Sequence, residues 1–379
     1  MLTPRERVLC ALNHDEPDRV PIFFGTSAAT TLLAPAYERL KAHLGIRSKT
    51  KVFSRGSQSV LMDEEVLLAA RSDGRPLVAG PAPSALAHEL PGDAYVDGWG
   101  CVWERRPGDL YFKVIDSPLR HATLDDLDNF SWPDLAYPGR FRGLKEQAQA
   151  TQQAGFAVVA LSGVSPFEQA FISRGIEELL YDLAGNQDFV LALLRKITDL
   201  MKASVIRLLE EAGSHIDVLI TGDDLGSQNA PLMSPAMYRR LIKPFHAELM
   251  AEIKRRTPAK IFYHSDGNIY PLIGDLIELG VDLLNPVQVS AKDMGDTARL
   301  KQQFGDRLAF CGAIDTQWTL PHGTPEDVRR EVRRRIKDLA PGGGYILAAV
   351  HCIQPDVPPE NICAMLDEAV AAGKYPLAF

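Results

Sequence analysis

The chain has 379 residues, of which 46% are hydrophobic and 24% are charged, as in an ordinary globular protein. The formal net charge of −8 and the dispersed arginines exclude the clustered basic surface that nucleic-acid binding needs. No stretch approaches the ~18 consecutive apolar residues of a membrane span, so no membrane partner is expected. Five cysteines, and an N-terminus that lacks an apolar signal segment, predict a cytoplasmic protein with reduced thiols.

The N-terminal segment predicts a helix followed by a strand. The sequence TPRE, residues 3–6, is a typical helix start, because the threonine can cap the helix, the proline suits its first position and the glutamate can complete a capping box. The helix is expected to end near residues 13–14. The apolar run VPIFFG, residues 20–25, then predicts a short strand closed by a glycine.

Residues 50–135 predict a β-containing lobe or insertion within the N-terminal third of the domain. The sequences SDGRP (72–76) and LPGDAYVDGWG (90–100) indicate turns. The stretch VWERRPGDLYFKVI, residues 102–115, predicts a hairpin whose turn is Pro-Gly-Asp. The aromatic residues of this segment are expected to form the core of the lobe.

From about residue 140 onward, apolar strands alternate regularly with helices. The predicted strands cover residues 156–163, 216–224, 259–267, 281–288, 307–315 and 343–352. Such alternation indicates repeated βαβ units and a parallel sheet. With the strand at 20–25 and one strand not placed, the count approaches eight and favours an α/β fold of the (β/α)8 TIM-barrel type, with residues 1–379 as a single domain. The absence of GxGxxG and GxxxxGK[ST] motifs disfavours dinucleotide-binding and P-loop proteins.

Chemistry in such a barrel collects at the carboxyl ends of the strands, and these ends are polar in this chain. The residues concerned are Asp223, Asp224, His264, Asp266, Asn285, Gln288, Cys311, Asp315, His351 and Cys352. Turn formation explains Asn285 and Asp315 about as well as a site does. The adjacent carboxylates of Asp223 and Asp224 repel each other unless a cation or a donor compensates them.

Five of these residues supply ligand atoms that suit zinc. His264, Asp266, Cys311, His351 and Cys352 offer nitrogen, carboxylate and thiolate from three strands that can converge on one rim. Three protein ligands with an open fourth position are typical of catalytic zinc. The sequence therefore indicates a metal site at the barrel mouth.

Several segments resemble the uroporphyrinogen decarboxylase-like superfamily. They are TPRERVLCALNHDEPDRVPIFF, GDDLGSQNAPLMSPAMYRRLIKPFHAEL, FYHSDGNI, LNPVQVSAKDM, FCGAIDTQ and GGGYILAAVHCIQPDVPPENI. The resemblance spans nearly the whole chain and implies a single (β/α)8 barrel. Decarboxylases of the superfamily hold substrate acetates with arginines of an MRQAGRY-type segment, whereas the corresponding residues 23–33, FFGTSAATTLL, contain no arginine. True uroporphyrinogen decarboxylation is therefore disfavoured.

The corrinoid-linked methyltransferases of this superfamily resemble the chain better. Their zinc motif is His-x-Cys with a distant Cys before Pro-x-x-Pro-x-Glu-Asn. On this sequence the motif falls on His264, on Asp266 in place of a cysteine, and on His351 with Cys352 beside it. The resemblance implies metal-assisted demethylation of a small methylated substrate, with a corrinoid protein as a possible partner and zinc as the cofactor. The His/Asp/His set is harder than the family's thiolates and suits the polarisation of a methyl ether or amine.

The remaining polar residues are assigned roles around this centre. Asp223 and Asp224, with His264, are the expected catalytic residues, because two adjacent carboxylates can supply a general acid and base. The expected substrate-binding residues are Gln228, Asn285, Gln288, Cys311 and Asp315.

Three alternatives remain open on the sequence. The cluster residues can grip substrate directly without a metal. A metal-independent decarboxylase or lyase acting on a small carboxylic acid or a tetrapyrrole would need a cation near the cleft, for which Arg174 and Lys292 are the nearest candidates. A non-enzymatic protein that binds a corrinoid or tetrapyrrole is the third.

Overall fold

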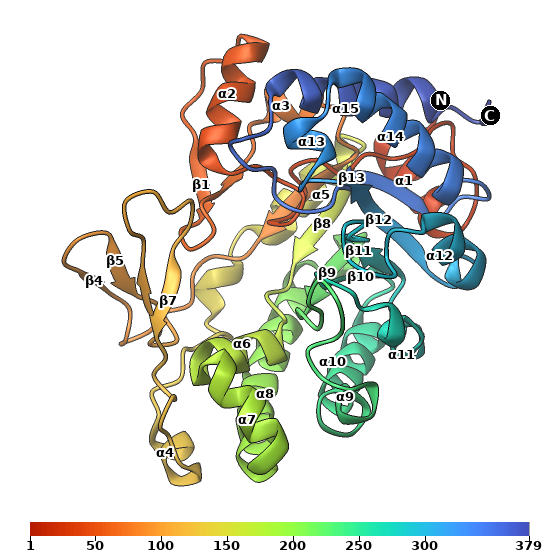
Figure 1. The fold of residues 1–379 in the computed structure, drawn as a ribbon. Helices are drawn as coiled ribbons and strands as arrows, with labels where there is room; N and C mark the ends of the chain where they lie inside the picture. The colour runs from red at the N-terminus through yellow and green to blue at the C-terminus, as the bar shows by residue number, and fades with distance from the viewer. Residues whose placement is uncertain (379) are drawn as a thin grey trace.

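The core of the fold is a curled, seven-stranded parallel sheet (Figure 1), seen in a computed structural model that describes residues 1–378. Its strands are β3 (Gly74–Val78), β8 (Ala157–Leu161), β9 (Val218–Gly222), β10 (Lys260–His264), β11 (Leu283–Asn285), β12 (Ala309–Ile314) and β13 (Tyr345–Ala349). They lie side by side in chain order, and every neighbouring pair is parallel. The predicted α/β barrel architecture is confirmed, and the six strands predicted beyond residue 150 each contain one of these strands.

The segment around Ile22 lies between β13 and β3 and occupies the eighth position. Ile22 forms a parallel bridge with Leu347, and its carbonyl accepts a hydrogen bond from the amide of Asp73 at 2.9 Å. The predicted strand at 20–25 is thus only a bridge. The reason is that the amide of Ile22 donates its hydrogen bond to the carboxylate of Asp73 at 2.8 Å and not to a strand partner. Arg7 and Arg19 hold this carboxylate in place.

The sequence SDGRP at residues 72–76 indicates a turn, but the structure has strand β3 there. In the structure Gly74 to Val78 pair with Ala157 to Leu161 of β8. Proline lacks an N–H and is confined to positions where no ladder hydrogen bond is needed. Pro76 is tolerated here because the neighbouring segment at Ile22 forms no continuous ladder along β3.

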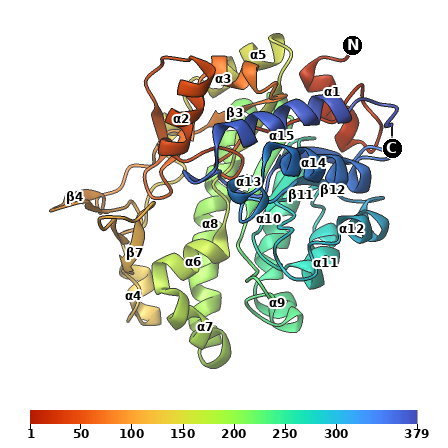
Figure 2. The ribbon, with the colours of Figure 1, turned by 45° about the horizontal axis from the view of Figure 1, so that its top comes forward.

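A four-stranded antiparallel sheet forms the lobe. It consists of β4 (His88–Leu90), β5 (Ala94–Val96), β6 (Val102–Glu104) and β7 (Lys113–Asp116), and β6 and β7 form the predicted hairpin. Tyr95 stacks on Trp103 with ring centroids 6.2 Å apart and packs edge-on against the buried Phe112, as expected for a lobe core, whereas Tyr111 is exposed and does not belong to it. Figures 1 and 2 show the lobe projecting from one side of the barrel.

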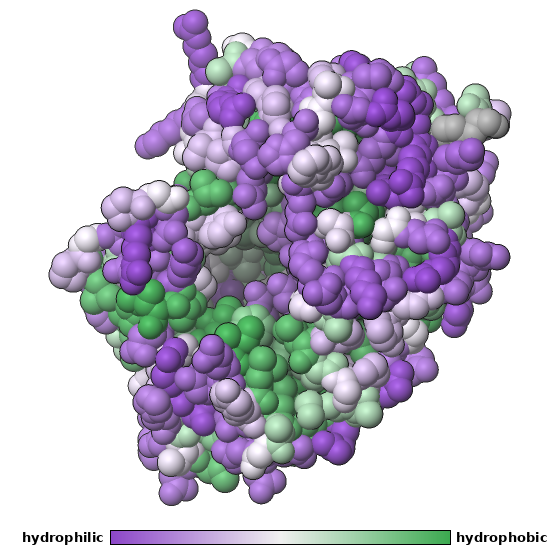
Figure 3. All heavy atoms as spheres, viewed as in Figure 1, coloured by the Kyte–Doolittle hydropathy of each residue, from purple (hydrophilic) through white to green (hydrophobic). Residues whose placement is uncertain are grey.

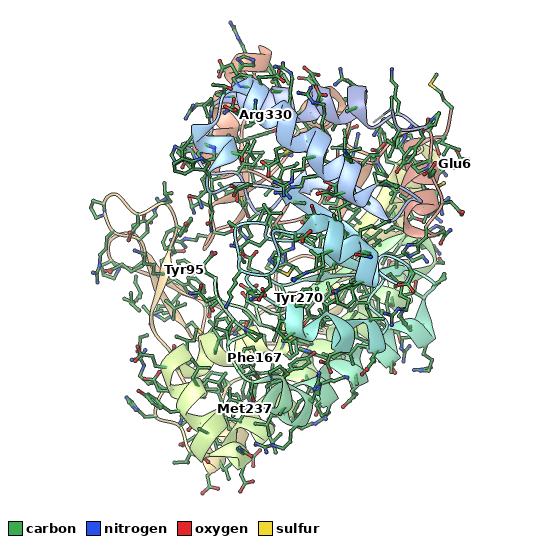
Figure 4. The ribbon with its side chains drawn as sticks, turned by 45° about the vertical axis from the view of Figure 1, so that its right-hand side comes forward. Glu6, Tyr95, Phe167, Met237, Tyr270 and Arg330 are labelled. Atoms are coloured by element: carbon green, nitrogen blue, oxygen red, sulfur yellow. The ribbon has the colours of Figure 1, made fainter. Side chains whose placement is uncertain are left out.

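The predicted boundaries 50–135 do not describe a single insertion, because β3 falls within them and belongs to the barrel. A separate hairpin of β1 (Lys51–Ser54) and β2 (Ser59–Leu61) precedes β3. In Figure 4, Tyr95 marks the lobe, apart from Phe167 and Tyr270 on the barrel.

Helices cover the outer face of the sheet (Figure 2). The first, α1 (Pro4–Leu12), carries the predicted capping box between Thr3 and Glu6. The others are α2 (Ala34–Leu44), α3 (Glu64–Ala69), α4 (Leu124–Asn129), α5 (Leu144–Gln153), α6 (Pro166–Arg174), α7 (Ile176–Gly185), α8 (Gln187–Ala212), α9 (Pro235–Leu241), α10 (Lys243–Arg256), α11 (Ile273–Glu278), α12 (Thr297–Phe304), α13 (Thr319–His322), α14 (Pro325–Leu339) and α15 (Pro359–Ala372), with 3-10 turns η1 (Pro138–Phe141), η2 (Gly213–His215) and η3 (Tyr270–Leu272). Across residues 1–378, none of the helices combines the length and the apolar character needed to cross a bilayer.

The hydrophobic core has two parts. The larger part fills the space between the sheet and the helices. The smaller part fills the barrel interior and includes Val159, Val218, Phe262, Leu283 and Cys311, each from a different strand. Since side chains alternate between the two faces of a strand, this inner layer plugs the barrel below the strand ends and leaves the carboxyl rim for a site.

Candidate metal centre at the barrel mouth

Three side chains meet at the carboxyl rim of the sheet. His264 is the last residue of β10, Asp266 follows in the next loop, and His351 lies just beyond β13. The Nε2 atom of His351 lies 3.6 Å from Oδ2 of Asp266, and that of His264 lies 3.9 Å from the same oxygen. Among the described residues 1–378, this is the group of His, Cys, Asp and Glu whose ligand atoms all lie within 4.8 Å of one another. The predicted convergence of β10 and β13 on one mouth is therefore present.

The backbone around His264 is held in place by its neighbours. Strand register places it beside Gly222 of β9 and Asn285 of β11. A Cβ atom at position 222 would lie 2.4 Å from the carbonyl oxygen of His264, so only glycine fits there. The Nδ1 of His264 lies 2.7 Å from Oδ1 of the fully buried Asn285, whose amide nitrogen donates to the Cys311 carbonyl at 3.2 Å.

This hydrogen bond fixes the role of each imidazole nitrogen. Because the amide nitrogen of Asn285 is already a donor, its oxygen must accept, and Nδ1 of His264 carries the proton. The lone pair of His264 then lies on Nε2, the atom that faces Asp266. Metal-bound histidines are commonly oriented in this way by a partner on the opposite ring nitrogen.

The charge state of the cluster also suits a cation. Burial disfavours a charged His264, but Asp266 and Asp224 outweigh it and raise the pKa of His264. Burial lowers the pKa of His351, in spite of Asp266 and with the help of the nearby His264. Two imidazoles thus share one carboxylate and compete for one positive charge.

The residues present fit a zinc ion. Oδ1 of Asp266 is buried and has no hydrogen-bond partner within the described chain, which is costly unless a cation or a donor satisfies it. Ligand atoms around tetrahedral zinc lie about 3.3 Å apart, as follows from bond lengths of about 2.0 Å. The separations of 3.6 and 3.9 Å are close to that arrangement.

Two cavities meet at this cluster. One has a volume of about 440 Å³ and a mainly apolar wall that includes Phe53, Leu161 and Ile220, and His264 reaches it. The other, of about 450 Å³, has a polar wall to which Asp266 belongs. His351 and Cys352 line both cavities. Figure 3 shows a hollow between the lobe and the barrel, with hydrophobic residues along part of its rim.

Two carboxyl groups, of Asp224 and Glu168, line the apolar cavity beside the cluster. Asp224 accepts a hydrogen bond from the amide of Asp266 at 2.9 Å, and Glu168 lies in the first turn of α6. Burial, together with the charges of Asp224 and Asp223, raises the pKa of Glu168 to about 8. Glu168 therefore holds a proton at neutral pH and can donate it.

Asp223 lies behind the rim. Its two oxygens accept hydrogen bonds from the amides of Phe167 and Glu168 at 3.0 and 2.7 Å, and one of them lies 2.6 Å from Nε2 of His246. The side chain is fully buried and does not line either cavity. This placement corrects the expectation that Asp223 orients substrate or exchanges protons with it. Asp223 instead anchors the start of α6 and so positions Glu168.

Three other predicted residues also have structural roles. Cys311 is buried in the barrel interior, where burial strongly raises the pKa of its thiol. Asp315 accepts hydrogen bonds from the amides of Gln317 and Thr319 at 2.9 and 3.4 Å. Asn285 supports His264 and lines neither cavity. These placements correct the expectation that Cys311, Asp315 and Asn285 contact substrate.

Cys352 was expected among the metal ligands. It lines both cavities, but it is not one of the residues whose ligand atoms converge. Burial raises the pKa of its thiol to about 12, so the thiol stays protonated at neutral pH. The structure therefore corrects the ligand set to His264, Asp266 and His351.

The predicted glutamines lie on the polar cavity. Gln228 and Gln288 both line it, and Oε1 of Gln288 accepts a hydrogen bond from the amide of Gly267 at 2.7 Å. The cations named for a metal-free lyase lie elsewhere. Arg174 is buried against Asp182 and two backbone carbonyls, and the exposed Lys292 lines neither cavity.

Sequence reasoning missed two residues of the apolar cavity, Glu168 and Arg140. Glu168 comes soon after β8, so the same search of strand ends would have found it. Arg140 lies in the 3-10 turn η1 before α5, far along the chain from any strand end on the rim. Its sequence neighbours give no sign that it reaches the mouth.

Comparison with known proteins gives the family. A model described as Uroporphyrinogen decarboxylase (URO-D) matches residues 110–371. The uroporphyrinogen decarboxylase of Alkalilimnicola ehrlichii is 37% identical over 380 residues, which cover 96% of this chain and 92% of that protein. That of Pseudoalteromonas translucida is 41% identical over 61 residues, only 17% of its length. A solved structure, a methyltransferase from Methanosarcina mazei, aligns over 98% of this chain and 99% of its own with a TM-score of 0.67 at 18% identity, which shows a shared fold. The chain therefore belongs to the uroporphyrinogen decarboxylase (URO-D) family.

Proposed function

We propose that this protein is a metal-dependent methyltransferase that demethylates a small substrate. The observation that carries the proposal is the cluster of His264, Asp266 and His351 at the wall shared by an apolar and a polar cavity. A methyl donor and a methyl acceptor must both reach one reacting carbon. Two cavities that meet at one cluster suit such a pair of reactants. We further propose a corrinoid protein as the acceptor.

His264, Asp266 and His351 would hold zinc, with a fourth position left for the substrate. When bound, zinc supplies the Lewis acidity that draws negative charge off a leaving oxygen, nitrogen or sulfur. Asn285 keeps the Nε2 lone pair of His264 directed at the site. Asp224 holds the loop that carries Asp266 through its backbone amide.

The loss of a methyl group leaves a basic heteroatom that must gain a proton. Glu168 is suited to this step, because it lines the apolar cavity, which we assign to the methyl donor, and its pKa is raised to about 8. The proton passes from the carboxyl oxygen of Glu168 to the heteroatom as the methyl group departs. Asp223 fixes Glu168 through its backbone amide, so the acid is held in place by the fold.

Decarboxylation is the second candidate, since curated relatives such as that of Alkalilimnicola ehrlichii are named uroporphyrinogen decarboxylases. The cavity walls argue against a polyanionic tetrapyrrole. Residues 23–33 contain no arginine, and among the described residues 1–378 Arg140 is the one arginine on the apolar cavity, whose volume is about 440 Å³. One cation cannot balance the many carboxylates of such a substrate.

The first experiment is metal analysis of the purified protein and three variants. We expect about one zinc per chain in the wild type, and loss of zinc in H264A and H351A. H215A is the matched control, because His215 is a partly buried histidine whose partners are Gln149 and Gln152. Wild-type protein that binds no zinc when zinc is supplied, or H264A that retains it, would refute the metal site.

The second experiment separates the two reactions. Zinc-loaded protein is incubated with methoxy-aryl compounds and reduced cobalamin, and methylcobalamin is followed by its absorbance. Uroporphyrinogen III is incubated in parallel, and released carbon dioxide is measured. Methylation of cobalamin that is lost in E168Q supports the proposal, whereas carbon dioxide release that is unaffected by a chelator supports decarboxylation. A co-purifying visible absorbance band without turnover in either assay would indicate a tetrapyrrole- or corrinoid-binding protein.

A further inference from the structure

Arg140 is fixed at the mouth of the barrel, next to the carboxyl end of β3. The amide of Gly80 donates to the Arg140 carbonyl at 2.7 Å, and Nε of Arg140 donates to the Gly80 carbonyl at 2.9 Å. Gly80 lies two residues after the end of β3, so this pair of hydrogen bonds ties η1 to the rim. Arg140 lines the same apolar cavity as His264 and His351.

The guanidinium of Arg140 is only partly satisfied. Its Nη1 donates to the Leu135 carbonyl and to Oγ of Ser204. Its Nη2 makes no hydrogen bond within residues 1–378 and is not sealed away from solvent. No carboxylate lies within ion-pair distance in the described chain, although Asp134 contributes a favourable charge from farther away.

Such an arrangement is costly for the protein. Arginine keeps its charge at every physiological pH, and burial lowers the pKa of Arg140 because desolvation disfavours the cation. Partly buried charges in proteins are usually paired with an opposite charge, so a charge without such a partner is unfavourable. Arg140 lines the apolar cavity and its Nη2 remains accessible, so a ligand in the cavity can provide that partner. A carboxylate matches a guanidinium in both charge and geometry.

The charges on the cavity wall would orient an anionic ligand. Asp224 and Glu168 stand beside the cluster, whereas Arg140 is held near β3, and β8 and β9 lie between β3 and β10 in the sheet. Three strand spacings of about 4.8 Å amount to roughly 14 Å along the barrel wall. In the metal-free protein a carboxylate is therefore repelled by the carboxylate of Asp224 at the cluster end and attracted at the Arg140 end.

The space between these ends is small and mainly apolar. The cavity volume of about 440 Å³ corresponds to roughly 15 water molecules at about 30 Å³ each. Its wall includes Phe53, Val78, Leu161 and Ile220. This space suits one aromatic ring or a short alkyl chain better than a sugar or a nucleotide, since apolar walls favour apolar ligands.

We propose that Arg140 binds the carboxylate of a small, apolar carboxylic acid whose methylated heteroatom then lies at the His264–Asp266–His351 cluster. The substrate class is thus methylated apolar acids, such as methoxy-substituted benzoates. The location of the methylated end depends on the proposed function. The binding of the carboxylate by Arg140 does not depend on it, because the cation and the cavity are present whichever reaction is catalysed.

The test measures binding to the full-length, metal-free protein by calorimetry. The probes are the isomeric methoxybenzoates and 4-methoxybutanoate, each paired with its neutral primary amide, which has nearly the same shape. We expect the wild type to bind at least one acid about tenfold or more tightly than its amide, as a charge-assisted hydrogen bond implies. R140M should abolish this preference.

Two further variants keep the test decisive. R142M is the matched control, because Arg142 is an exposed neighbour that does not line the cavity, and it should keep the preference for the acid. R140Q retains donors for the carbonyls that Arg140 holds, so it serves if R140M does not fold. The inference is overturned if the wild type binds no acid more tightly than its amide, or if folded R140M or R140Q keeps the preference. Preference for the acid without any methyl transfer to cobalamin would leave this inference standing and refute the proposed function.

Discussion

The substitution Asn285→Ala tests whether a residue that only supports His264 affects zinc binding at the proposed metal site. Asn285 does not touch either cavity, yet its amide oxygen accepts the Nδ1 proton of His264 at 2.7 Å. Its removal leaves that donor and the Cys311 carbonyl without their partner inside the protein. We expect a loss of about 1–3 kcal/mol in the free energy of unfolding of the metal-free protein. Without the acceptor, the imidazole can also carry its proton on Nε2, the atom proposed to bind zinc.

Loss of such a partner typically lowers metal affinity by about 10–100-fold, which is roughly 1.4–2.7 kcal/mol. The affinity is measured by competition with a zinc-binding fluorescent chelator, and the stability by urea unfolding without metal. Asn361→Ala is the matched control, because Asn361 is also buried and its amide donates at 2.8 Å to two carbonyls, of Leu320 and Gly323. Both variants should lose stability, and only N285A should lose zinc affinity. An N285A protein with wild-type affinity would show that Asn285 does not orient His264 for metal binding.

Three further changes follow from contacts at the rim. Asp223→Asn should lower the free energy of unfolding by about 2–4 kcal/mol, seen in urea titrations, because one of the amides that Asp223 binds would then face a donor; unchanged stability would contradict its anchoring role. Gly222→Ala should abolish zinc binding in metal analysis, since a Cβ placed 2.4 Å from the His264 carbonyl must displace β10; full zinc occupancy would refute this. For Glu168, the folded-state pKa of about 8 exceeds the ordinary glutamate value of 4.5, so its contribution to stability is complete below about pH 4.5 and is lost as the pH rises through 8. Glu168→Gln should therefore gain stability relative to wild type between about pH 5 and 9 in metal-free unfolding experiments, by up to about 5 kcal/mol, and a difference independent of pH would refute the shift.

Much of the barrel is predictable from local patterns, since six apolar strands each end in a polar residue and alternate with helices. Local patterns do not predict the two segments that close the barrel, residues 20–25 and strand β3. At residues 20–25 the backbone is held by the side chain of Asp73, which no local pattern reveals. At residues 72–76 the turn-forming residues Asp73, Gly74 and Pro76 obscure β3, because their compatibility with a strand depends on which segment lies alongside.

The candidate site likewise contains residues that the sequence predicts and residues that it does not. His264, Asp266 and His351 follow from their positions at strand ends and from their ligand chemistry. Their separation from Asp223 does not follow from the sequence, because adjacent residues on a rim point in different directions and Asp223 turns toward α6. Arg140 depends on tertiary contacts with Gly80 and Ser204, which are distant in the chain.

The wall shared by the two cavities has a consequence for the order of events in catalysis. A reactant seated in the apolar cavity does not block the polar one, since His351 and Cys352 are the residues that both have in common. For the proposed methyl transfer, donor and acceptor can therefore be present together, and initial-rate plots at varied concentrations of both should give intersecting lines, the pattern of a ternary complex. A shuttle in which the first product must leave before the second reactant enters would give parallel lines.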